Sequence, residues 1–423
     1  MQKIALPVLA HCVLSAVCLL AQEPAAPPSV KVFGANPFGQ QIPAEMQQAL
    51  DQLTAAGQVE GRRSSLTFFR WANAQPPRLA HLGLWGPKVG NDQLRLALAL
   101  PDLEFVSLYE TNVDNQGFPL LAQLPKLRAL AVVPIERYEK QGFGPTQWSF
   151  PFMPRRAERP RITGESLRPF EKVATLESLN LLDAQLNSAD LSILAQWPKL
   201  STLGLPSAID AQTIQHLQAC PKLTRLTIGH REISAAEVQL LAGWKSLRQL
   251  SIHTAILPDA TLQALSQLES VQVLELMDCG LTDDRLQHLR GLHGLQQLSL
   301  ARNEIDGPGL SHLAHLKLED LGLEFNNLRN ETLHHLPQLK QVQSLGLSYC
   351  KGITNQGLAS GTLQSMTHLT AIRFRGLNQL TNAAFDDLIK MQHLKHINIR
   401  STGISNDFVP QLKHSMPNTT VFK

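Results

Sequence analysis

The chain contains little of what marks a disulfide-stapled, nucleic-acid-binding or membrane-spanning protein. It has 5 cysteines in 423 residues. The three outside the N-terminal segment, Cys220, Cys279 and Cys350, are predicted to be buried core residues and not disulfide partners. Lys and Arg total 38 against 35 Asp and Glu, a formal net charge of +3, which gives no support for the concentrated basic face that nucleic-acid binding needs. After residue 21, no apolar run is long enough to span a bilayer.

Signatures of catalysis and of cofactor binding are absent too. No HExxH, P-loop, GxSxG, paired CxxC or dinucleotide-type glycine string occurs. His288, His312 and His335 recur at equivalent positions of successive segments. Neighbouring helices lie about 8 to 10 Å apart, whereas zinc requires every ligand nitrogen at about 2 Å. We therefore expect a solvated helix face there, no metal, no cofactor and no enzymatic activity.

One pattern dominates the chain: L-x-x-L-x-L, with Val, Ile or Phe at some of its apolar positions. Successive copies are 23 to 27 residues apart, except for one interval of 49 residues. Such a fixed period indicates a stack of like structural units. The thirteen copies begin at Leu79, Leu103, Leu127, Leu176, Leu200, Leu223, Leu247, Val271, Leu295, Leu318, Val342, Leu369 and Leu394.

The copy LQQLSLARN, which begins at Leu295, illustrates the unit. Because successive side chains of a strand point to opposite faces, Leu298 is expected to point into the core while Gln297 and Ser299 face outward. Asn303 follows where the chain turns, and its amide can bond backbone groups of neighbouring units that would otherwise be buried unpaired. Other copies place an amide or a small residue in this slot: Asn326, Thr111, Ala184, Ala208, Ala255, Cys279, Cys350 and Thr402.

Each copy continues with a polar residue and a helical pattern, as in LTDDRLQHLRGL from Leu281 and ISAAEVQLLAGW from Ile233. Ser234 followed by Glu237 predicts a capping box. Helices are wider than the roughly 4.8 Å between paired strands, so a stack with strands on one side and helices on the other must bend. The sequence therefore predicts an α/β solenoid, or horseshoe, with a parallel sheet on its concave side and helices on its convex side.

These residues resemble the leucine-rich repeat superfamily over residues 79 to 417. Copies such as LELMDCGLTDDRLQHLRGL and LGLSYCKGITNQGLASGTL resemble its ribonuclease-inhibitor-like and cysteine-containing subtypes. Exported bacterial proteins with ITDxGLxxL-type repeats are similar in length and layout. The resemblance implies a protein-binding scaffold, and the superfamily has no shared catalytic residues that could be carried over.

The two ends of the chain are predicted to lie outside the repeats. Residues 1–21, with Lys3 followed by an apolar run, have the pattern of a secretory signal peptide, which predicts a secreted or periplasmic protein. Residues 22–42 form a Pro/Ala-rich linker. A helical pattern and a strand-like segment within residues 43–78 are expected to cap the stack. The repeats then occupy residues 79–417, and residues 418–423 form a last half coil.

The outward-facing strand positions supply candidate contact residues. Aromatic side chains dominate protein interfaces, and those of the first copies, Trp85, Phe105 and Tyr109, cannot belong to the leucine core. The alternative is that the N-terminal cap or the long insertion covers them. In later copies these positions are polar or charged, and a solvated strip is the alternative there. The later candidates are His253, Glu275, Asp320, Glu324, Arg373, Arg375 and Arg400.

Between Leu127 and Leu176 the period doubles, and residues 134–175 lack the expected further copy. Long irregular insertions in repeat proteins are usually functional or disordered. Trp148, Arg155 and Arg156 of this insertion are predicted to help hold a partner over the aromatic positions. The alternative is a degenerate coil with a surface loop.

Taken together, the patterns predict an exported, monomeric, non-catalytic scaffold that binds a protein through its concave face. A receptor for glycans or cell-wall polymers is a different possibility, in which Trp85, Tyr109 and Trp148 stack on sugar rings. A third hypothesis is an enzyme with an unrecognised site in residues 134–175.

Overall fold

The computed structural model describes residues 31–32, 44–56, 66–72, 78–86, 89–109, 111–133, 162–182, 184–206, 209–229 and 231–423. These residues divide into two compact units. One contains the described residues up to 224 and is called the N-terminal unit, and the other contains residues 225–423 and is called the C-terminal unit. Among the described helices, none combines the length and the apolar character needed to cross a bilayer.

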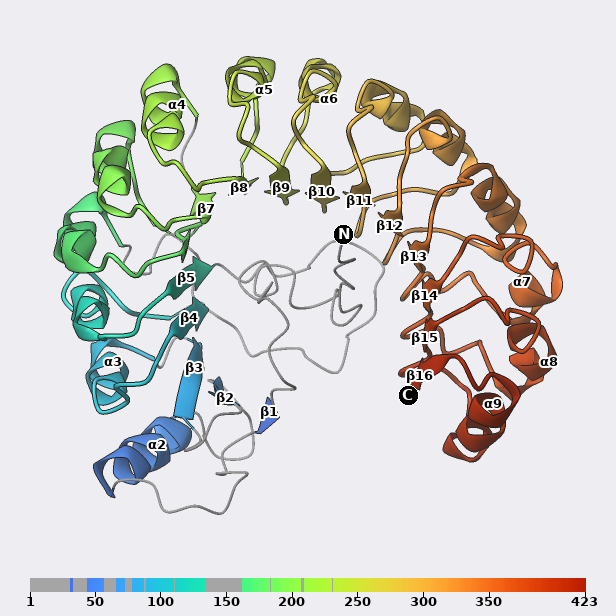
Figure 1. The fold of residues 1–423 in the computed structure, drawn as a ribbon, viewed down its shortest axis with the longest axis horizontal. Helices are drawn as coiled ribbons and strands as arrows, with labels where there is room; N and C mark the ends of the chain where they lie inside the picture. Colours follow the sequence, from blue (N-terminus) through green and yellow to red (C-terminus); the bar gives the residue numbers. More distant parts are fainter. Residues whose placement is uncertain are drawn as a thin grey trace, which may run out of the picture. The chain divides into compact units, whose positions relative to one another are not determined.

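The N-terminal unit is an ordered row of strands backed by helices (Figure 1). β1 (Lys31–Val32) pairs antiparallel with β2 (Leu66–Ala72), which pairs antiparallel with β3 (Arg78–Trp85). From β3 onward each strand pairs in parallel with the next: β4 (Phe105–Tyr109), β5 (Ala129–Val133), β6 (Ser178–Asn180) and β7 (Thr202–Leu205). The helices are α2 (Ala44–Ala56), α3 (Asn91–Ala97), η1 (Phe118–Gln123), η3 (Gly164–Lys172), η4 (Ser188–Gln196) and α4 (Ala211–Gln218), where η denotes a 3-10 helix.

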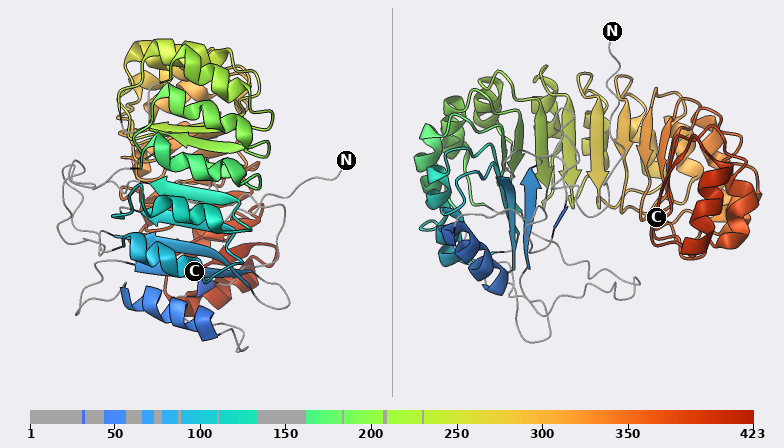
Figure 2. Two further views of the ribbon diagram at one scale, coloured as in Figure 1. Left: turned by 90° about the vertical axis from the view of Figure 1, so that its left-hand side faces the viewer. Right: turned by 60° about the horizontal axis from the view of Figure 1, so that its bottom comes forward.

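The C-terminal unit repeats one strand-turn-helix coil. Its strands line the concave side and its helices the convex side (Figures 1 and 2). Each strand pairs in parallel with the next: β8 (Arg225–Gly229), β9 (Gln249–His253), β10 (Val273–Met277), β11 (Gln297–Ser299), β12 (Asp320–Gly322), β13 (Ser344–Gly346), β14 (Ala371–Arg373), β15 (His396–Asn398) and β16 (Thr420–Phe422). The helices are α5 (Ala235–Ala242), α6 (Asp259–Leu265), η5 (Asp284–Leu289), η6 (Pro308–Leu313), η7 (Asn330–Gln338), α7 (Asn355–Ala359), η8 (Asn382–Ala384), α8 (Phe385–Leu388), η9 (Asn406–Phe408) and α9 (Val409–Ser415).

The leucines of the pattern form ladders inside the coils. Leu274, Leu298, Leu321 and Leu345 pair in register across β10 to β13, and each is at most 1% exposed. Full burial of one such side chain stabilises the fold by about 1.5 to 3 kcal/mol. Inward leucines, a parallel sheet and convex helices confirm the predicted fold class, an α/β leucine-rich repeat solenoid.

Several convex helices are tighter than the predicted α-helices. The segment from Leu281 forms the 3-10 helix η5, and η7 contains Pro337. A short segment held between two turns is where 3-10 geometry is common, and proline removes a donor that an α-helix would use. α5 has the predicted capping box, because Ser234 Oγ accepts from the Glu237 N–H at 3.3 Å and the Glu237 carboxylate accepts from the Ser234 N–H at 2.9 Å.

The position at which the chain turns away from each strand, held by Asn303 and Asn326, is called the asparagine slot. As the sequence predicts, the amide there bonds backbone groups of neighbouring coils. Asn303 Oδ1 accepts from the backbone N–H groups of Cys279 and Leu281, at 3.0 and 3.1 Å, and its Nδ2 donates to the carbonyl of Leu276 at 2.7 Å. Asn326 makes equivalent bonds one coil later. One buried amide therefore bonds the backbones of two coils.

The three cysteines are buried and free, which confirms their prediction as core residues. In the slot, Cys279 Sγ donates to the carbonyl of Ile252 at 3.5 Å, and Cys350 Sγ to that of Leu323 at 3.2 Å. Burial raises the pKa of Cys220 to about 11 and that of Cys350 to about 12. Both thiols are therefore poor nucleophiles in the folded chain.

Polar side chains also join the start of one convex helix to the next coil. Asn330 Nδ2 donates to Thr354 Oγ1, and Asn330 Oδ1 accepts from the Thr354 N–H, both at 2.9 Å. The same arrangement recurs between Asn355 and Thr381 and between Asn382 and Ser405. These bonds fix the helix starts, and with them the register of the coils.

The predicted N-terminal cap and the insertion after β5 are each described in part. The described residues 44–56 and 66–72 form a helix and then a strand, α2 and β2, in the order predicted for the cap. The capping role of these residues stays a prediction. β5 pairs directly with β6, with Ala129 opposite Ser178. Of the insertion, the described residues 162–175 therefore contribute the helix η3 and no strand to the parallel row.

Candidate binding surface

In the C-terminal unit, each of the strands β9 to β15 is followed by a residue in the left-handed conformation. L residues pay about 1 to 2 kcal/mol for this conformation. Inter-coil bonds hold it: the Phe325 N–H donates to the Ser348 carbonyl at 2.9 Å, and the Tyr349 N–H to the Arg375 carbonyl at 2.8 Å. Stacking of coils thus sets the side chains of these residues in a row at one edge of the sheet. The row consists of Thr254, Asp278, Arg302, Phe325, Tyr349 and Ser401, with φ from 48° to 60°, and Gly376, with φ 76°.

Part of this row stacks tightly. The rings of Phe325 and Tyr349 lie 4.4 Å apart at an angle of 11°. The guanidinium carbon of Arg302 lies 4.2 Å from the centroid of the Phe325 ring, and that of Arg375 lies 5.9 Å from the Tyr349 ring. Gly376 packs so closely on Tyr349 that a Cβ there would overlap the ring. We call Arg302, Phe325, Tyr349 and Arg375 the edge stack. Its rings are half-buried, and their faces are already occupied.

Beside the edge stack, three predicted residues form one cluster on the concave strands. Arg373 Nε lies 3.0 Å from Glu324 Oε1, its Nη2 lies 3.2 Å from Asp320 Oδ1, and its Nη1 donates to Ser344 Oγ at 2.7 Å. We call these four residues the ion cluster. A Cβ on Gly346 would overlap the Glu324 carboxylate, so this glycine makes room for the cluster.

The ion cluster is largely removed from solvent. The side chain of Glu324 is 3% exposed and that of Arg373 is 15% exposed. Burial opposes the charge of Arg373, but Glu324 and Asp320 outweigh burial and raise the pKa of its guanidinium above the usual value. The arginine therefore stays charged, with its donors directed at fixed acceptors.

A second predicted pair lies in the middle of the unit. Glu275 Oε2 accepts from the Ser251 hydroxyl at 2.9 Å and lies 3.5 Å from His253 Nε2. All three residues are buried. In a serine nucleophile relay the imidazole stands between the hydroxyl and the carboxylate, whereas here the carboxylate stands between the other two. The order of these groups is not that of a catalytic triad.

The last coils carry basic side chains that are not matched by acids. Arg400 is exposed, and Arg375 and His396 are partly exposed. Arg375 Nε and His396 Nδ1 are buried atoms with no hydrogen-bond partner among the described residues. Arg375 and Arg400 thus differ from Arg373 of the ion cluster, because among the described residues no carboxylate pairs with them.

The predicted aromatic group lies on adjacent strands of the N-terminal unit. Trp85 of β3 pairs in register with Tyr109 of β4. Phe105 is half-buried, with its ring 6.1 Å from that of His81. The side chain of Tyr109 is only 5% exposed, so little of it is available for contact. Trp148, Arg155 and Arg156 of the insertion lie outside the described residues.

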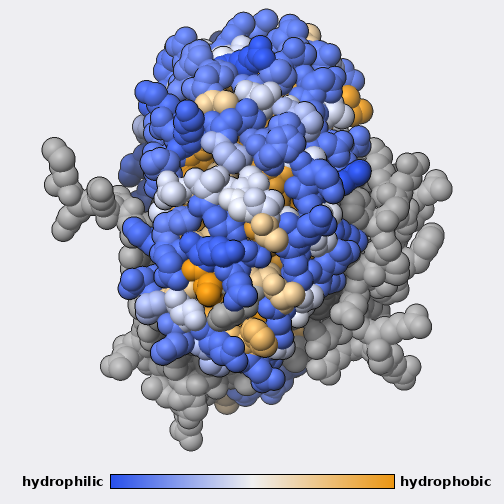
Figure 3. Space-filling view, turned by 90° about the vertical axis from the view of Figure 1, so that its right-hand side faces the viewer, coloured by the Kyte–Doolittle hydropathy of each residue, from blue (hydrophilic) through white to orange (hydrophobic). Residues whose placement is uncertain are grey.

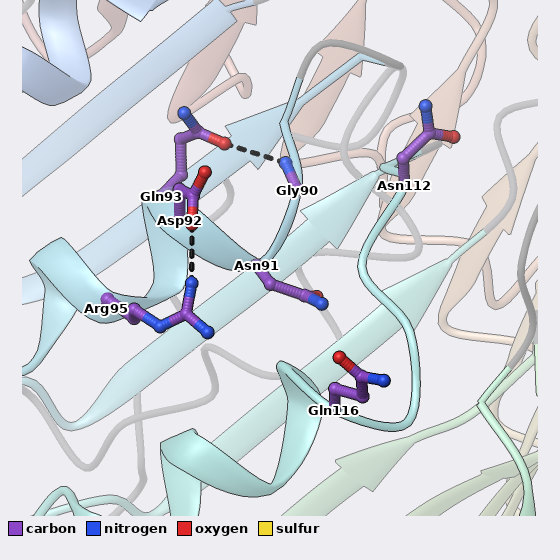
Figure 4. A pocket seen from close by; sticks show the side chains of 7 residues that line it. All are labelled: Gly90, Asn91, Asp92, Gln93, Arg95, Asn112 and Gln116. Carbon is purple, nitrogen blue, oxygen red and sulfur yellow. Dashed lines mark hydrogen bonds and ion pairs between the residues drawn. The ribbon is translucent and has the colours of Figure 1, made fainter.

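A polar depression lies at the start of α3 (Figure 4). Its side chains largely bond to one another or to nearby backbone. Gln93 Oε1 accepts from the Gly90 N–H at 2.8 Å, and Arg95 donates to Asp92 at 2.5 Å. Asn91 donates to Asp114 at 2.7 Å, and this bond, the largest of several effects, lowers the pKa of Asp114. The depression is a network of helix caps and contains no evident ligand site.

The convex face of the last coils is mainly hydrophilic, with apolar side chains in small separate groups (Figure 3). His312 contacts Arg290, and burial and then the charge of Arg290 lower the pKa of this histidine. The rings of His334 and His335 lie 3.9 Å apart. In the described part of the chain, no group of His, Cys, Asp or Glu side chains has the arrangement of a metal site.

Sequence reasoning missed the aromatic half of the candidate surface. It considered only the outward positions of each strand and so omitted Arg302, Phe325 and Tyr349, which follow the strands. Their spacing of 23 and 24 residues equals the repeat period, and this was the available signal. The strand positions themselves were sufficient to find the charged residues of the ion cluster.

No family model matches the chain, and a search of curated proteins finds no relative. Solved structures with a similar fold include an internalin of Listeria monocytogenes (19% identity, 77% of this chain and 82% of that chain, TM-score 0.41) and a leucine-rich repeat protein of Leptospira interrogans (16% identity, 78% and 92%, TM-score 0.34). A third is TLR13 in complex with ssRNA13 (18% identity, 78% and 54%, TM-score 0.43), of which this chain spans about half the length. These likenesses concern the fold only, and the assignment to the leucine-rich repeat class rests on the coil geometry of this chain.

Proposed function

We propose that this chain is an exported, non-catalytic scaffold that binds a protein partner through the concave strands and strand ends of its C-terminal unit. The observation that carries the proposal is the edge stack, in which two half-exposed aromatic side chains are fixed between arginines. Aromatic and arginine side chains dominate the energy of protein interfaces. Because these are already ordered, binding costs little additional side-chain entropy.

The ion cluster supports the same function in a different way. Its charges are already paired with one another, so it adds orientation and specificity more than affinity. His253 and Glu275 are buried side by side, so they support the shape of this face more than they contact a partner. Among the described members of the predicted set, Arg375 and Arg400 are partly or fully exposed and form no ion pair, so we propose them as the charged contacts.

The other parts of the proposal rest on the sequence. Export rests on the signal-peptide pattern of residues 1–21. The ribonuclease-inhibitor-like, cysteine-containing subtype is supported by Cys279 and Cys350 in the asparagine slot. Lack of catalysis is supported by the order of Ser251, Glu275 and His253. Trp85, Phe105, Trp148, Arg155 and Arg156 remain proposed contacts of secondary importance.

Photo-crosslinking in the full chain tests the proposal. A photoreactive amino acid is placed at Gln297, a half-buried position on the concave strand β11, and in a matched variant at Gln287, an exposed position on the convex helix η5. In an extract of the native source, one and the same protein should be cross-linked from Gln297 and not from Gln287. Equal cross-linking from both positions, or cross-linking from Gln287 alone, would exclude the concave face as the binding surface.

A further inference from the structure

The last coils differ in charge from the rest of the chain. After Glu331 no Asp or Glu occurs until Asp386, and the stretch from 332 to 423 contains nine Lys and Arg against three Asp, a net charge of +6. The whole chain has a net charge of only +3, so the remainder is net acidic. The positive charge is therefore concentrated at this end of the repeats.

The two acids of the ion cluster are not free to pair with further arginines. Asp320 and Glu324, the two carboxylates of the ion cluster, are both engaged by Arg373. Arg375 and Arg400 occupy the same outward position of two consecutive coils, and among the described residues neither forms an ion pair. Neighbouring strands are about 4.8 Å apart, so the backbones of Arg375 and Arg400 lie at roughly that distance from each other.

A second observation independently points to a ligand. Arg375 Nε is a buried atom that has no hydrogen-bond partner among the described residues. A buried donor without an acceptor is unfavourable. A ligand that presents anionic oxygens beside Arg375 would offer acceptors to its guanidinium group and would also neutralise the charges of Arg375 and Arg400.

The aromatic rings of the edge stack, to which Arg375 belongs, narrow the class of ligand. Nucleobases and sugars bind aromatic residues by stacking on open ring faces. Here one face of Phe325 is covered by Arg302 and the other by Tyr349, and Tyr349 lies between Phe325 and Gly376. The rings offer edges only, which suit the apolar side chain of a peptide and not a stacked base or sugar.

We infer that the Arg375–Arg400 end of the concave face binds an extended acidic peptide segment of the partner protein. The inference rests on the proposed function and names the kind of segment recognised there. In an extended peptide, residues i and i+2 lie on the same side about 6.6 to 6.8 Å apart, so two acidic residues spaced by one residue can meet Arg375 and Arg400. An apolar residue two positions earlier would lie against the edges of Phe325 and Tyr349.

The test uses the full chain and a fluorescein-labelled decapeptide with Leu at position i and Glu at i+2 and i+4. Fluorescence anisotropy should detect binding that weakens as salt is added. Replacing both Glu by Gln, or making the Arg375→Ala, Arg400→Ala double substitution, should weaken binding by about 10-fold or more, because each removes charge-assisted hydrogen bonds. Arg290→Ala, which removes an exposed arginine of the convex side, should leave the affinity unchanged.

Arg400→Glu alone keeps the test decisive if the double variant fails to fold, because the side chain is exposed; it should also abolish binding. Unchanged affinity in Arg400→Glu, no binding of the acidic peptide, or tighter binding of a 12-nucleotide single strand or of inorganic phosphate would overturn the inference. If no protein is cross-linked from Gln297 in the chain that keeps Arg375 and Arg400, the proposed function fails. If the Gln297 cross-link persists undiminished in the double variant, only the acidic-segment inference fails.

Discussion

The coils of the N-terminal unit and those of the C-terminal unit carry the same leucine pattern but differ in how their charges are paired. In the N-terminal unit, Arg128, the residue before β5, lies between two acids that precede the neighbouring strands, 3.2 Å from Glu104 and 2.7 Å from Glu177. In the last coils of the C-terminal unit, Arg375 and Arg400 form no ion pair with any described acid. The matched charges link adjacent coils, whereas we propose the unmatched ones as contacts for a partner.

The aromatic residues of the two units differ in the same sense. Tyr109 faces outward by strand alternation yet is 5% exposed, whereas Phe325 and Tyr349 follow their strands and are half-exposed. An outward strand position is therefore not sufficient for availability. The exposed fraction of a side chain depends also on the side chains packed against it and on its position within or after the strand.

The largest expected difference between the units is in cysteine reactivity. At pH 8 native Cys350, with a pKa of about 12, should react with iodoacetamide at least about 1000-fold more slowly than in the unfolded chain, because only the thiolate reacts. Cys220 of the N-terminal unit, with a pKa of about 11, should be slowed less. Peptide mapping by mass spectrometry measures both rates. Native labelling of Cys350 as fast as in urea would contradict the closed slot.

The next largest effect is expected from the asparagine slot. Asn326→Ala removes an amide that bonds two coils and leaves the Ile305 N–H unpaired, which should lower the free energy of unfolding by about 3 kcal/mol. Cys350→Ala in the same slot is the matched control and should cost about 1 kcal/mol. Urea denaturation followed by circular dichroism measures both. Equal losses would mean that the slot needs small size and no amide, as Ala184 in the N-terminal unit suggests.

A smaller effect is expected at the floor of the ion cluster. Gly346→Ala places a Cβ in the space of the Glu324 carboxylate, which should separate it from Arg373 and destabilise the fold by about 2 kcal/mol. Gly243→Ala serves as control, because its φ is −71° and its Cβ would lie 3.3 Å from the Leu240 carbonyl oxygen, and it should change stability by less than about 1 kcal/mol. Thermal unfolding of both variants is the measurement. No loss in Gly346→Ala would mean that the cluster tolerates rearrangement.

The smallest effect is expected at a helix cap of the N-terminal unit. Asp210 accepts from the Ser188 hydroxyl at 2.5 Å and from the Thr213 N–H at 2.7 Å, and these bonds lower its pKa below 3.8. Because the folded pKa is depressed, this stabilisation is present above pH 3.8 and is lost as the pH falls through the folded value. Asp210→Ala should cost about 1 kcal/mol at pH 7 and less at pH 2. If the loss of free energy of unfolding in Asp210→Ala were the same at pH 7 and pH 2, the ionised carboxylate would not be what caps the helix.

Much of the fold could be predicted from the sequence because one period is repeated many times. The strand positions, the inward leucines, the slot at Asn303 and the capping box at Ser234 all follow from local pattern. The 3-10 form of η5 could not be predicted, because its helical spacing of leucines fits both helix types and the length between turns decides.

The candidate surface was predictable only in part. Asp320 and Arg373 lie on strands, and Glu324 follows β12 by two residues, so the alternation of the predicted strand places all three on one face. The contact of Arg373 with the two acids also needs the space above Gly346, which the pattern does not predict. The edge stack escaped prediction because Phe325 and Tyr349 adopt a left-handed conformation that their residue types disfavour. Bonds to the next coil impose it, and such bonds cannot be read from one repeat.

The most direct test of the claim that unmatched charges serve binding is a double-mutant cycle between Arg375 and the acidic decapeptide. Affinities are measured for the native chain and Arg375→Ala, each with the peptide carrying both Glu and with peptides in which one Glu is replaced by Gln. A direct contact predicts a coupling energy of about 1 kcal/mol or more for one of the two Glu positions. Coupling energies near zero for both positions would contradict the account.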